Sequence, residues 1–230
     1  MKAFKFLSPG AVGLFSEFTW PPAGEWIQAP QPIADCLVGV HAVRFEQLLD
    51  WIDDELWEVE LDGAIAERDG MLVAERGRLV RRVEQWDDAA ARSFAAACAG
   101  RTAGFAADAL RRAGLAPEAE RIEQAGAPSE AQEAAVAAIG ATTDTAVVEV
   151  LAFAADMVSL VGGNRPDTWG EEAATTVTQT PGAVAANAAF VSAHAAGRAA
   201  VAATADESSY GPGFAAERAW QLARLHDTLG

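Results

Sequence analysis

The hydrophobic pattern of the chain changes near Trp86. Upstream of this residue, short apolar runs alternate with polar positions, most clearly over residues 56–61, and such alternation is typical of half-buried strands. Downstream of it, apolar residues recur at the spacing of amphipathic helices. The pattern predicts an α+β protein: a small mixed α/β module over residues 1–85, followed by an all-α, Ala-rich helical bundle over residues 86–230.

Several short elements are expected in the first module. Apolar residues at helical spacing from Phe45 predict a helix that ends near Asp53, preceded by a loop that contains His41. Asp62-Gly63 predicts a turn. Strands are predicted over residues 3–7, 13–20, 26–27 and 56–61, and residues 71–74 and 78–83 form either two strands or one interrupted strand.

The second half is expected to form helices separated by Gly and Pro. Asp87 is the expected N-cap of the first helix and Gly114 its C′ residue. Capping-box patterns begin at Ser129 and at Thr168. The segment 183–205 has Ala on nearly every face, which predicts a central position in the bundle. The predicted helices span residues 87–113, 117–125, 129–140, 144–161, 183–205 and 214–229.

The charge balance argues against anionic partners. The chain has 33 Asp and Glu against 17 Lys and Arg, a net charge of −16, and should repel nucleic acid and anionic membranes. No apolar run is long enough to cross a membrane, and the N-terminus lacks a leader pattern, so a cytoplasmic protein is expected. Arg76, Arg78, Arg81 and Arg82 are a candidate basic patch, and the alternative is a solvated strand end or helix entry.

Polar residues of the first module are the best candidates for chemistry. His41 follows a glycine at the expected start of a helix, where free N–H groups favour an anion, and Arg44 is close to it in sequence. Glu58 and Glu60 lie on one face of a predicted strand, where a carboxylate can serve as a general base or accept from a ribose hydroxyl. The alternative is that both glutamates form the solvent face of an amphipathic strand.

Motifs of common enzymes and metal sites are absent from the sequence. Cys36 and Cys98 are isolated from each other and give neither a disulfide framework nor a CxxC clip. No HExxH, GxSxG, GxGxxG or P-loop pattern occurs. We therefore expect no metal and no resident cofactor.

An ordered set of residues in the first 85 positions indicates a family. In order and spacing, this region resembles an uncharacterised bacterial domain found in actinobacterial hypothetical proteins and in phage-associated ones. The family implies no established activity. It implies that Cys36 and His41 have a shared role. The occurrence of the family in phage-associated proteins suggests a regulator linked to phage or defence. The residues that carry the resemblance are Lys2-Ala3-Phe4, Trp20, Cys36, Gly39-Val40-His41-Ala42, Trp51 and Leu56-Trp57-Glu58-Val59-Glu60-Leu61.

Polar residues also occur within the Ala-rich helices. Glu149 and Asp156 interrupt an apolar helix, while Asn187, His194 and Arg198 share one face of another. A buried carboxylate needs a partner, and His194 or Arg198 is the expected one. The sequence leaves open whether this group is structural or functional.

The leading hypothesis is a non-enzymatic binding or assembly protein. Five of the seven Trp lie in the first module or at its end, and they suggest an aromatic surface with the helical half as scaffold or dimer surface. A protein partner or self-association is expected, and a small-molecule ligand is compatible with it. The surface would be formed by Trp20, Trp26, Trp51 and Trp57.

The alternative is an enzyme of ADP-ribosyltransferase type that acts on a nicotinamide nucleotide. His41 would bind a ribose or phosphate, and Arg44 a phosphate. Glu58 or Glu60 would act as the acid. This hypothesis depends on a loop histidine and a strand Glu-x-Glu within a small α/β module.

Overall fold

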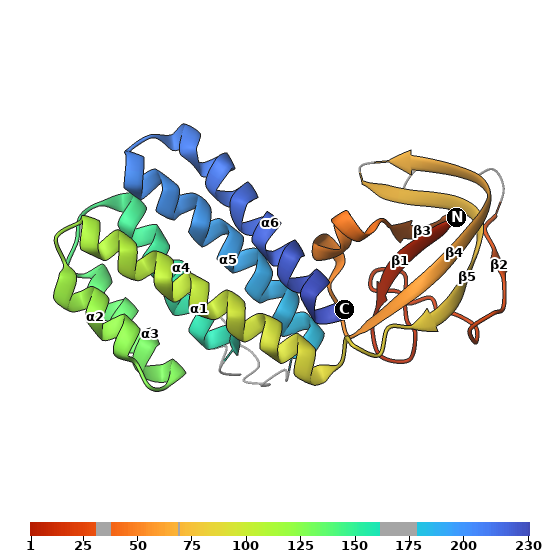
Figure 1. Cartoon of the computed structure of the whole chain (residues 1–230), viewed down its shortest axis with the longest axis horizontal. Helices are drawn as coiled ribbons and strands as arrows, with labels where there is room; N and C mark the ends of the chain where they lie inside the picture. Colours follow the sequence, from red (N-terminus) through yellow and green to blue (C-terminus); the bar gives the residue numbers. More distant parts are fainter. Residues whose placement is uncertain (31–37, 69, 162–178) are drawn as a thin grey trace, which may run out of the picture. The chain divides into compact units, whose positions relative to one another are not determined.

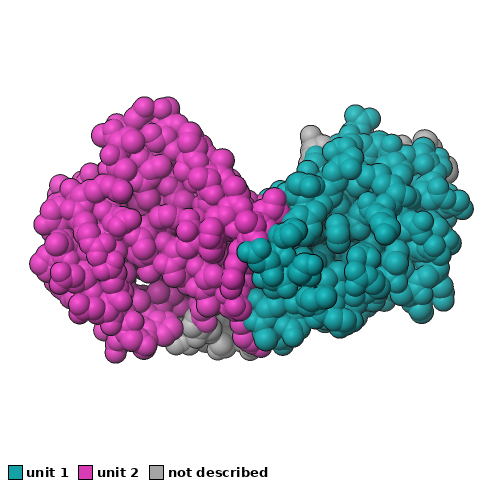
Figure 2. All heavy atoms as spheres, in the orientation of Figure 1, with its two compact units in different colours: residues 1–91, 181–186, 225–230 teal, residues 92–180, 187–224 magenta. Residues whose placement is uncertain are grey.

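The computed structural model describes residues 1–30, 38–68, 70–161 and 179–230. The chain forms two compact units (Figure 2). The first contains residues 1–91 together with 181–186 and 225–230, and the second contains residues 92–180 and 187–224. Strands lie in the first and helices make up the second, so the α+β prediction is confirmed.

The first unit is built on a closed, barrel-like antiparallel sheet (Figure 1). β1 lies between β3 and β4, and β5 pairs with both β3 and β4, which closes the ring. The short β2 pairs with β5 beyond the end of β3. The strands are β1 (Lys2–Leu7), β2 (Ile27–Gln28), β3 (Val40–Val43), β4 (Glu55–Arg68) and β5 (Met71–Arg82).

Alternate residues of these strands point into one core, because successive side chains of a strand face opposite sides of the sheet. The interior is crowded where β5 crosses β3. A Cβ at Gly77 would lie 2.7 Å from Val40 Cγ1, so no larger residue fits there. The buried core residues are Ala3, Leu7, Trp20, Ala29, Val40, Ala42, Val59, Leu61, Leu72, Ala74 and Leu79.

Two predicted elements of this unit are wrong. Residues 13–20 form no named strand, because local bonds such as Glu17 N–H to Gly13 O (3.0 Å) turn the chain back on itself. The residues around His41 were predicted to form a loop but form strand β3, which pairs with β1 on one side and with β5 on the other. The predicted helix is a 3₁₀ helix, η1 (Phe45–Trp51).

The hairpin of β4 and β5 also differs from the prediction. The predicted turn at Asp62-Gly63 is wrong, since β4 continues to Arg68. Gly63 adopts a φ of +82°, and the register with β5 shifts between Asp62 and Ile65. Such an irregularity bends a strand and lets a small sheet close. The region 71–83 is one strand, β5, the second of the two alternatives.

The helices agree with the predicted ones apart from a few boundary residues (Figure 1). α5 begins at Pro181, and α6 begins at Tyr210 rather than Phe214, directly after the 3₁₀ helix η2 (Glu207–Ser209). The helices are α1 (Asp88–Arg112), α2 (Ala116–Gln124), α3 (Pro128–Ile139), α4 (Thr145–Val161), α5 (Pro181–Thr204) and α6 (Tyr210–Leu229). Within the described part of the chain, no helix is long and apolar enough to cross a membrane.

Side-chain caps explain several helix boundaries. Asp87 Oδ1 accepts from Ala90 N–H (2.8 Å), which confirms the predicted cap of α1. Gly114 has the expected positive φ, +80°, after α1. The capping box at Ser129 is wrong, because α3 begins one residue earlier and Ala127 is its N-cap. The box at Thr168 lies outside the described residues.

Small side chains dominate the core of the second unit, so its helices approach closely. α5 is less central than predicted, because Phe190 on this helix is 60% exposed. The buried core residues are Ala106, Ala107, Ala109, Leu110, Ala119, Ile122, Ala135, Ala138, Val147, Val150, Leu151, Ala154, Ala155 and Ala199.

The start of α5 gives a sharp test of packing in the first unit. A Cβ at Gly182 would lie 2.3 Å from Asp53 C and 2.4 Å from Asp54 N, both of them backbone atoms that cannot rotate away. We expect Gly182→Ala to destabilise the protein by roughly 1–3 kcal/mol, measured from the shift of the urea unfolding midpoint. Gly211→Ala is the matched control, since it is likewise the second residue of a helix but has nothing within 4 Å. Equal effects of the two substitutions would contradict this packing.

Candidate functional site

The residues predicted to form a site in the first unit do not come together as one constellation. His41 lies on β3 beside the core residues Val40 and Ala42 but alternates with them, and its backbone carbonyl accepts from Lys5 Nζ at 2.9 Å. It is not at the start of a helix, so the expected anion site on free N–H groups is wrong. Cys36 lies outside the described residues.

Glu58 and Glu60 are held in ion pairs with β5. Arg81 Nε donates to Glu58 Oε2 at 3.0 Å, and Arg78 Nη2 donates to Glu60 Oε2 at 2.6 Å. Both carboxylates are occupied by guanidinium groups of the neighbouring strand, so this arrangement favours the solvent-face interpretation of the two glutamates.

The other arginines of β5 are paired in the same way. Arg76 pairs with Asp62, and Arg82 Nη1 lies 3.5 Å from Glu55 Oε1. The cross-strand pairs balance the positive charge of β5 with the acids of β4. The candidate basic patch is therefore a neutralised face of the hairpin, which argues against a nucleic-acid surface there.

Arg44 is exposed and engaged elsewhere. It is the N-cap of η1, and its Nη2 lies 3.0 Å from Glu67 Oε2. The Arg44 guanidinium lowers the pKa of Glu67 through a hydrogen bond and its charge. β1 lies between the strands that carry His41 and Glu58, so a single ligand contact to all of these groups is not built into the sheet.

The predicted aromatic surface is only partly present. Trp20 is 7% exposed and belongs to the core. Trp26 is 40% exposed, and its ring lies 5.1 Å from Arg76 Cζ and 4.8 Å from Arg78 Cζ. Trp51 and Trp57 are half-buried.

A run of acidic residues that sequence reasoning missed holds the first unit together. Asp53 accepts from Ser8 Oγ (2.6 Å), and Glu55 accepts from Gly10 N–H (3.0 Å) and Trp57 Nε1 (3.0 Å). Burial raises the pKa of Asp53. The signal available in the sequence was a run of three consecutive acids directly before a predicted strand. The half-buried end of a strand does not itself require charged residues, so such a run indicates another structural role.

The second unit contains a charged pair that joins two helices, and its carboxylate is buried while its arginine is partly exposed. Glu217 of α6 has a side chain that is 0% exposed, and it accepts from Arg101 Nε of α1 (2.6 Å) and from Ser192 Oγ of α5 (2.7 Å). The Arg101 guanidinium also stacks on Trp220, with Cζ 4.3 Å from the ring centroid. Burial, with the charge of Glu217, raises the pKa of the Cys98 thiol to about 12, so that thiol is inert at neutral pH.

Beside this pair lies a cavity of about 290 Å³ between α1, α5 and α6. Phe105 and a series of alanines form its apolar wall. Within the described ranges, Arg112 at its edge makes no ion pair, whereas Arg101 is paired with Glu217. The lining residues are Arg101, Phe105, Asp108, Arg112, Ala196, Ala199, Ala200, Ala203, Gly213, Ala216 and Glu217.

The polar residues predicted in the Ala-rich helices form a separate contact. Arg198 Nε lies 3.1 Å from Glu149 Oε2, which confirms the expected partnership between α4 and α5. His194 Nδ1 is hydrogen-bonded to the Tyr210 hydroxyl, and burial lowers the pKa of His194. Asp156 is exposed and does not share this contact.

Known proteins add no functional information. Comparison with family models, with curated proteins and with solved structures finds no match. Among the residues that the structure describes, no group of three or more His, Cys, Asp and Glu side chains is arranged to hold a metal ion. Among the described residues, the cavity of the second unit, about 290 Å³, is larger than the pocket lined by Lys5 and His41 in the first unit, about 30 Å³.

The buried pair predicts an asymmetric response to mutation. Arg101→Met leaves Glu217 buried without its cationic partner, and we expect a loss of roughly 3 kcal/mol of unfolding free energy. The double variant Arg101→Met/Glu217→Gln should recover much of this loss. Arg121→Met removes an exposed ion pair with Glu118 and should cost less than about 1 kcal/mol. Urea unfolding of the four proteins measures this, and similar losses for Arg101→Met and Arg121→Met would contradict the pair's role.

Asp53 predicts a distinctive pH dependence. Its pKa is higher in the folded than in the unfolded chain, so folding binds its proton more tightly. The contribution of Asp53 to stability therefore falls as the pH rises from the unfolded pKa through the folded one. Stability measured from pH 3.5 to 7 should decline less with rising pH for Asp53→Asn than for the wild type. Glu67→Gln is the control. Because Arg44 lowers the pKa of Glu67, the contribution of Glu67 to stability grows as the pH rises, so its removal should change the pH dependence in the opposite direction.

Proposed function

We propose that this acidic chain is a non-enzymatic binding protein that holds a small amphipathic anion in the cavity between α1, α5 and α6. The observation that supports the proposal is the cavity itself, whose volume of about 290 Å³ is close to the lower end of the usual range for ligand pockets. The proposal is a more specific form of the leading hypothesis from the sequence.

The walls determine the apolar part of the ligand. Methyl groups of Ala199 and Ala200 and the Phe105 ring offer dispersion contacts and no hydrogen bonds. α5 and α6 lie close together beside the cavity. The short distance shows in Gly213, where an added Cβ would lie only 2.7 Å from Ala196 O. An unbranched or flat hydrocarbon group suits such a narrow, largely preformed space.

The charges at the edge determine the polar part. Arg101 is satisfied by Glu217, whereas Arg112 is exposed and carries no ion pair within the described residues. A carboxylate or phosphate at the mouth would pair with Arg112. Asp108 at the same edge disfavours a second negative group, so a single anionic head is the best match.

The polar groups support binding rather than catalysis. Glu217 is held by Arg101 and Ser192, which leaves it as a structural charge instead of a general base. The ADP-ribosyltransferase-like alternative gains no specific support, because its acids Glu58 and Glu60 are paired with arginines. A protein partner or self-association stays a prediction, and the exposed Phe15, at 81%, is compatible with it.

Octanoate is a suitable probe, with titration calorimetry as the measurement. We expect Ala216→Leu, which adds bulk at the cavity wall, to weaken octanoate binding more than tenfold, or about 1.4 kcal/mol. Ala215→Leu is the matched control: its residue is the neighbour on α6, is equally exposed and does not line the cavity. Absence of octanoate binding to the wild type, or equal binding by both variants, would remove the proposal.

The charged edge is tested separately. Arg112→Ala should weaken octanoate binding by up to about fivefold, the magnitude expected of an exposed ion pair, and should leave binding of 1-octanol unchanged. Arg121→Ala, on α2 and outside the cavity, should leave both unchanged. If octanoate and octanol respond alike to Arg112→Ala, the anionic part of the proposal is wrong.

A further inference from the structure

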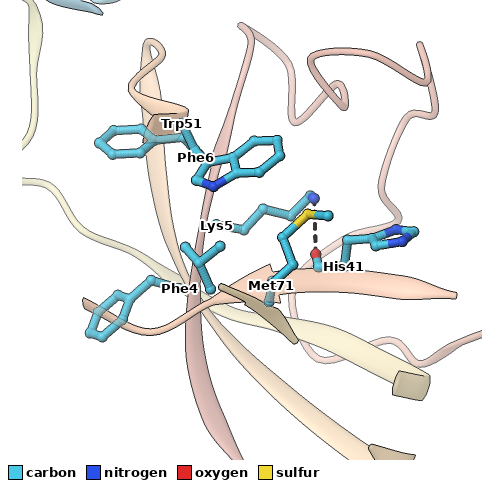
Figure 3. A pocket seen from close by; sticks show the side chains of 8 residues that line it. Phe4, Lys5, Phe6, His41, Trp51 and Met71 are labelled. Atoms are coloured by element: carbon cyan, nitrogen blue, oxygen red, sulfur yellow. Dashed lines mark hydrogen bonds between the residues drawn. The ribbon is translucent and has the colours of Figure 1, made fainter. Parts of the chain in front are cut away.

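Lys5 of β1 lies in a pocket of the first unit, and neither hypothesis from the sequence gives this lysine a role. Figure 3 shows its amine end beside Met71 and directed at the His41 carbonyl. The pocket is small, about 30 Å³, and partly open to solvent, so a small molecule can reach it from outside. Its lining residues are Phe4, Lys5, Phe6, His41, Ala42, Val43, Trp51 and Met71.

The Lys5 amine has no counterion. Its Nζ donates to His41 O at 2.9 Å and lies 5.8 Å from the centre of the Trp20 ring, and among the described residues no carboxylate lies within ion-pairing distance. This is unusual in a chain with 33 acidic residues, and it contrasts with the paired arginines of β5. An ammonium group that loses water and gains no counterion is destabilised relative to the neutral amine.

The protonation of Lys5 follows from this environment. Burial lowers the pKa of Lys5 to about 8, so about a tenth of the amine is neutral at pH 7. His41 is the one titratable neighbour among the described residues that line the pocket. The side chains that face Lys5 from the other elements do not titrate near neutral pH: Trp57 opposite it on β4, Met71 of β5, Trp51 of η1 and Trp20.

We propose that Lys5 is a nucleophilic amine that captures small aldehydes as an imine in this pocket. The neutral amine attacks the carbonyl carbon, a C–N bond forms, and the oxygen becomes the hydroxyl of a carbinolamine. That hydroxyl then leaves as water with the remaining proton of the nitrogen, which gives the C=N bond without any oxidant or reductant. The site lies in the first unit and is independent of the cavity proposed for the amphipathic anion.

The pocket selects the aldehyde by size and polarity. The space enclosed beside Lys5 admits a carbonyl with a short alkyl group and excludes a fused aromatic ring system. Phe4, Trp51 and Met71 form an apolar wall that a short alkyl group can contact. The carbonyl oxygen of His41 can accept from the iminium N–H as it does from the amine.

The chain supplies an internal control, because Lys2 and Lys5 are its only lysines and Lys2 is exposed. Wild-type protein is incubated with propanal and cyanoborohydride between pH 6 and 10, and peptide fragmentation then assigns the adducts to Lys2, Lys5 or the α-amine. We expect Lys5 to be modified roughly tenfold or more faster than Lys2 at pH 7, with a half-maximal rate near pH 8.

Size selectivity separates the pocket from simple amine reactivity. A pyrene aldehyde should label Lys2 and spare Lys5, whereas propanal should favour Lys5. Lys5→Arg should remove the fast adduct, and Lys2→Arg should leave it unchanged. Equal rates at the two lysines, or equal labelling of Lys5 by both aldehydes, would overturn the proposal, and neither result depends on the folding of a variant.

Discussion

The first unit depends on the carboxylates at Asp53, Asp54 and Glu55, which collect hydrogen-bond donors from distant parts of the chain. Asp53 accepts from Ser8 Oγ, Asp54 from Gly182 N–H and Glu55 from Gly10 N–H. A buried carboxylate without donors is costly, so these donors must be in place when the unit folds. The segment thereby ties the loop after β1 and the start of α5 to the start of β4.

Closure of the sheet by β5 explains where charge is and is not neutralised. Because β4 and β5 pair along most of their length, acids of one lie opposite arginines of the other, as Glu60 does with Arg78. Lys5 faces a different environment: its partner across β1 and β4 is Trp57, and its amine reaches only a backbone carbonyl. The same topology that neutralises the outer face of the hairpin thus isolates one amine, and this isolation is the basis of its proposed reactivity.

The helices could be predicted because their signals are local in the sequence. The closure of the sheet and the sites could not be predicted, because they depend on contacts between distant parts of the chain. Asp87 caps α1 through a residue three positions away, a spacing visible in the sequence. Strand β3 exists because β1 and β5 pair with it, so His41 appeared to lie in a loop when its neighbours alone were considered. Arg101 and Glu217 are 116 residues apart, and no local pattern connects them.

The Ala-rich sequence of the second unit has opposite consequences in different places. Where small residues face each other, as at Gly213 and Ala196 on the wall of the cavity, the backbones of α5 and α6 approach so closely that a Cβ at Gly213 would lie 2.7 Å from Ala196 O. Where α1 presents Phe105 and two arginines to the alanines of α5 and α6, the short methyl groups do not fill the space, and the cavity results. Arg101 and Glu217 fix the distance between α1 and α6 on one side of it. The cavity is consequently braced by a charge pair as well as by close backbone contact, which is the preorganisation that a binding site needs.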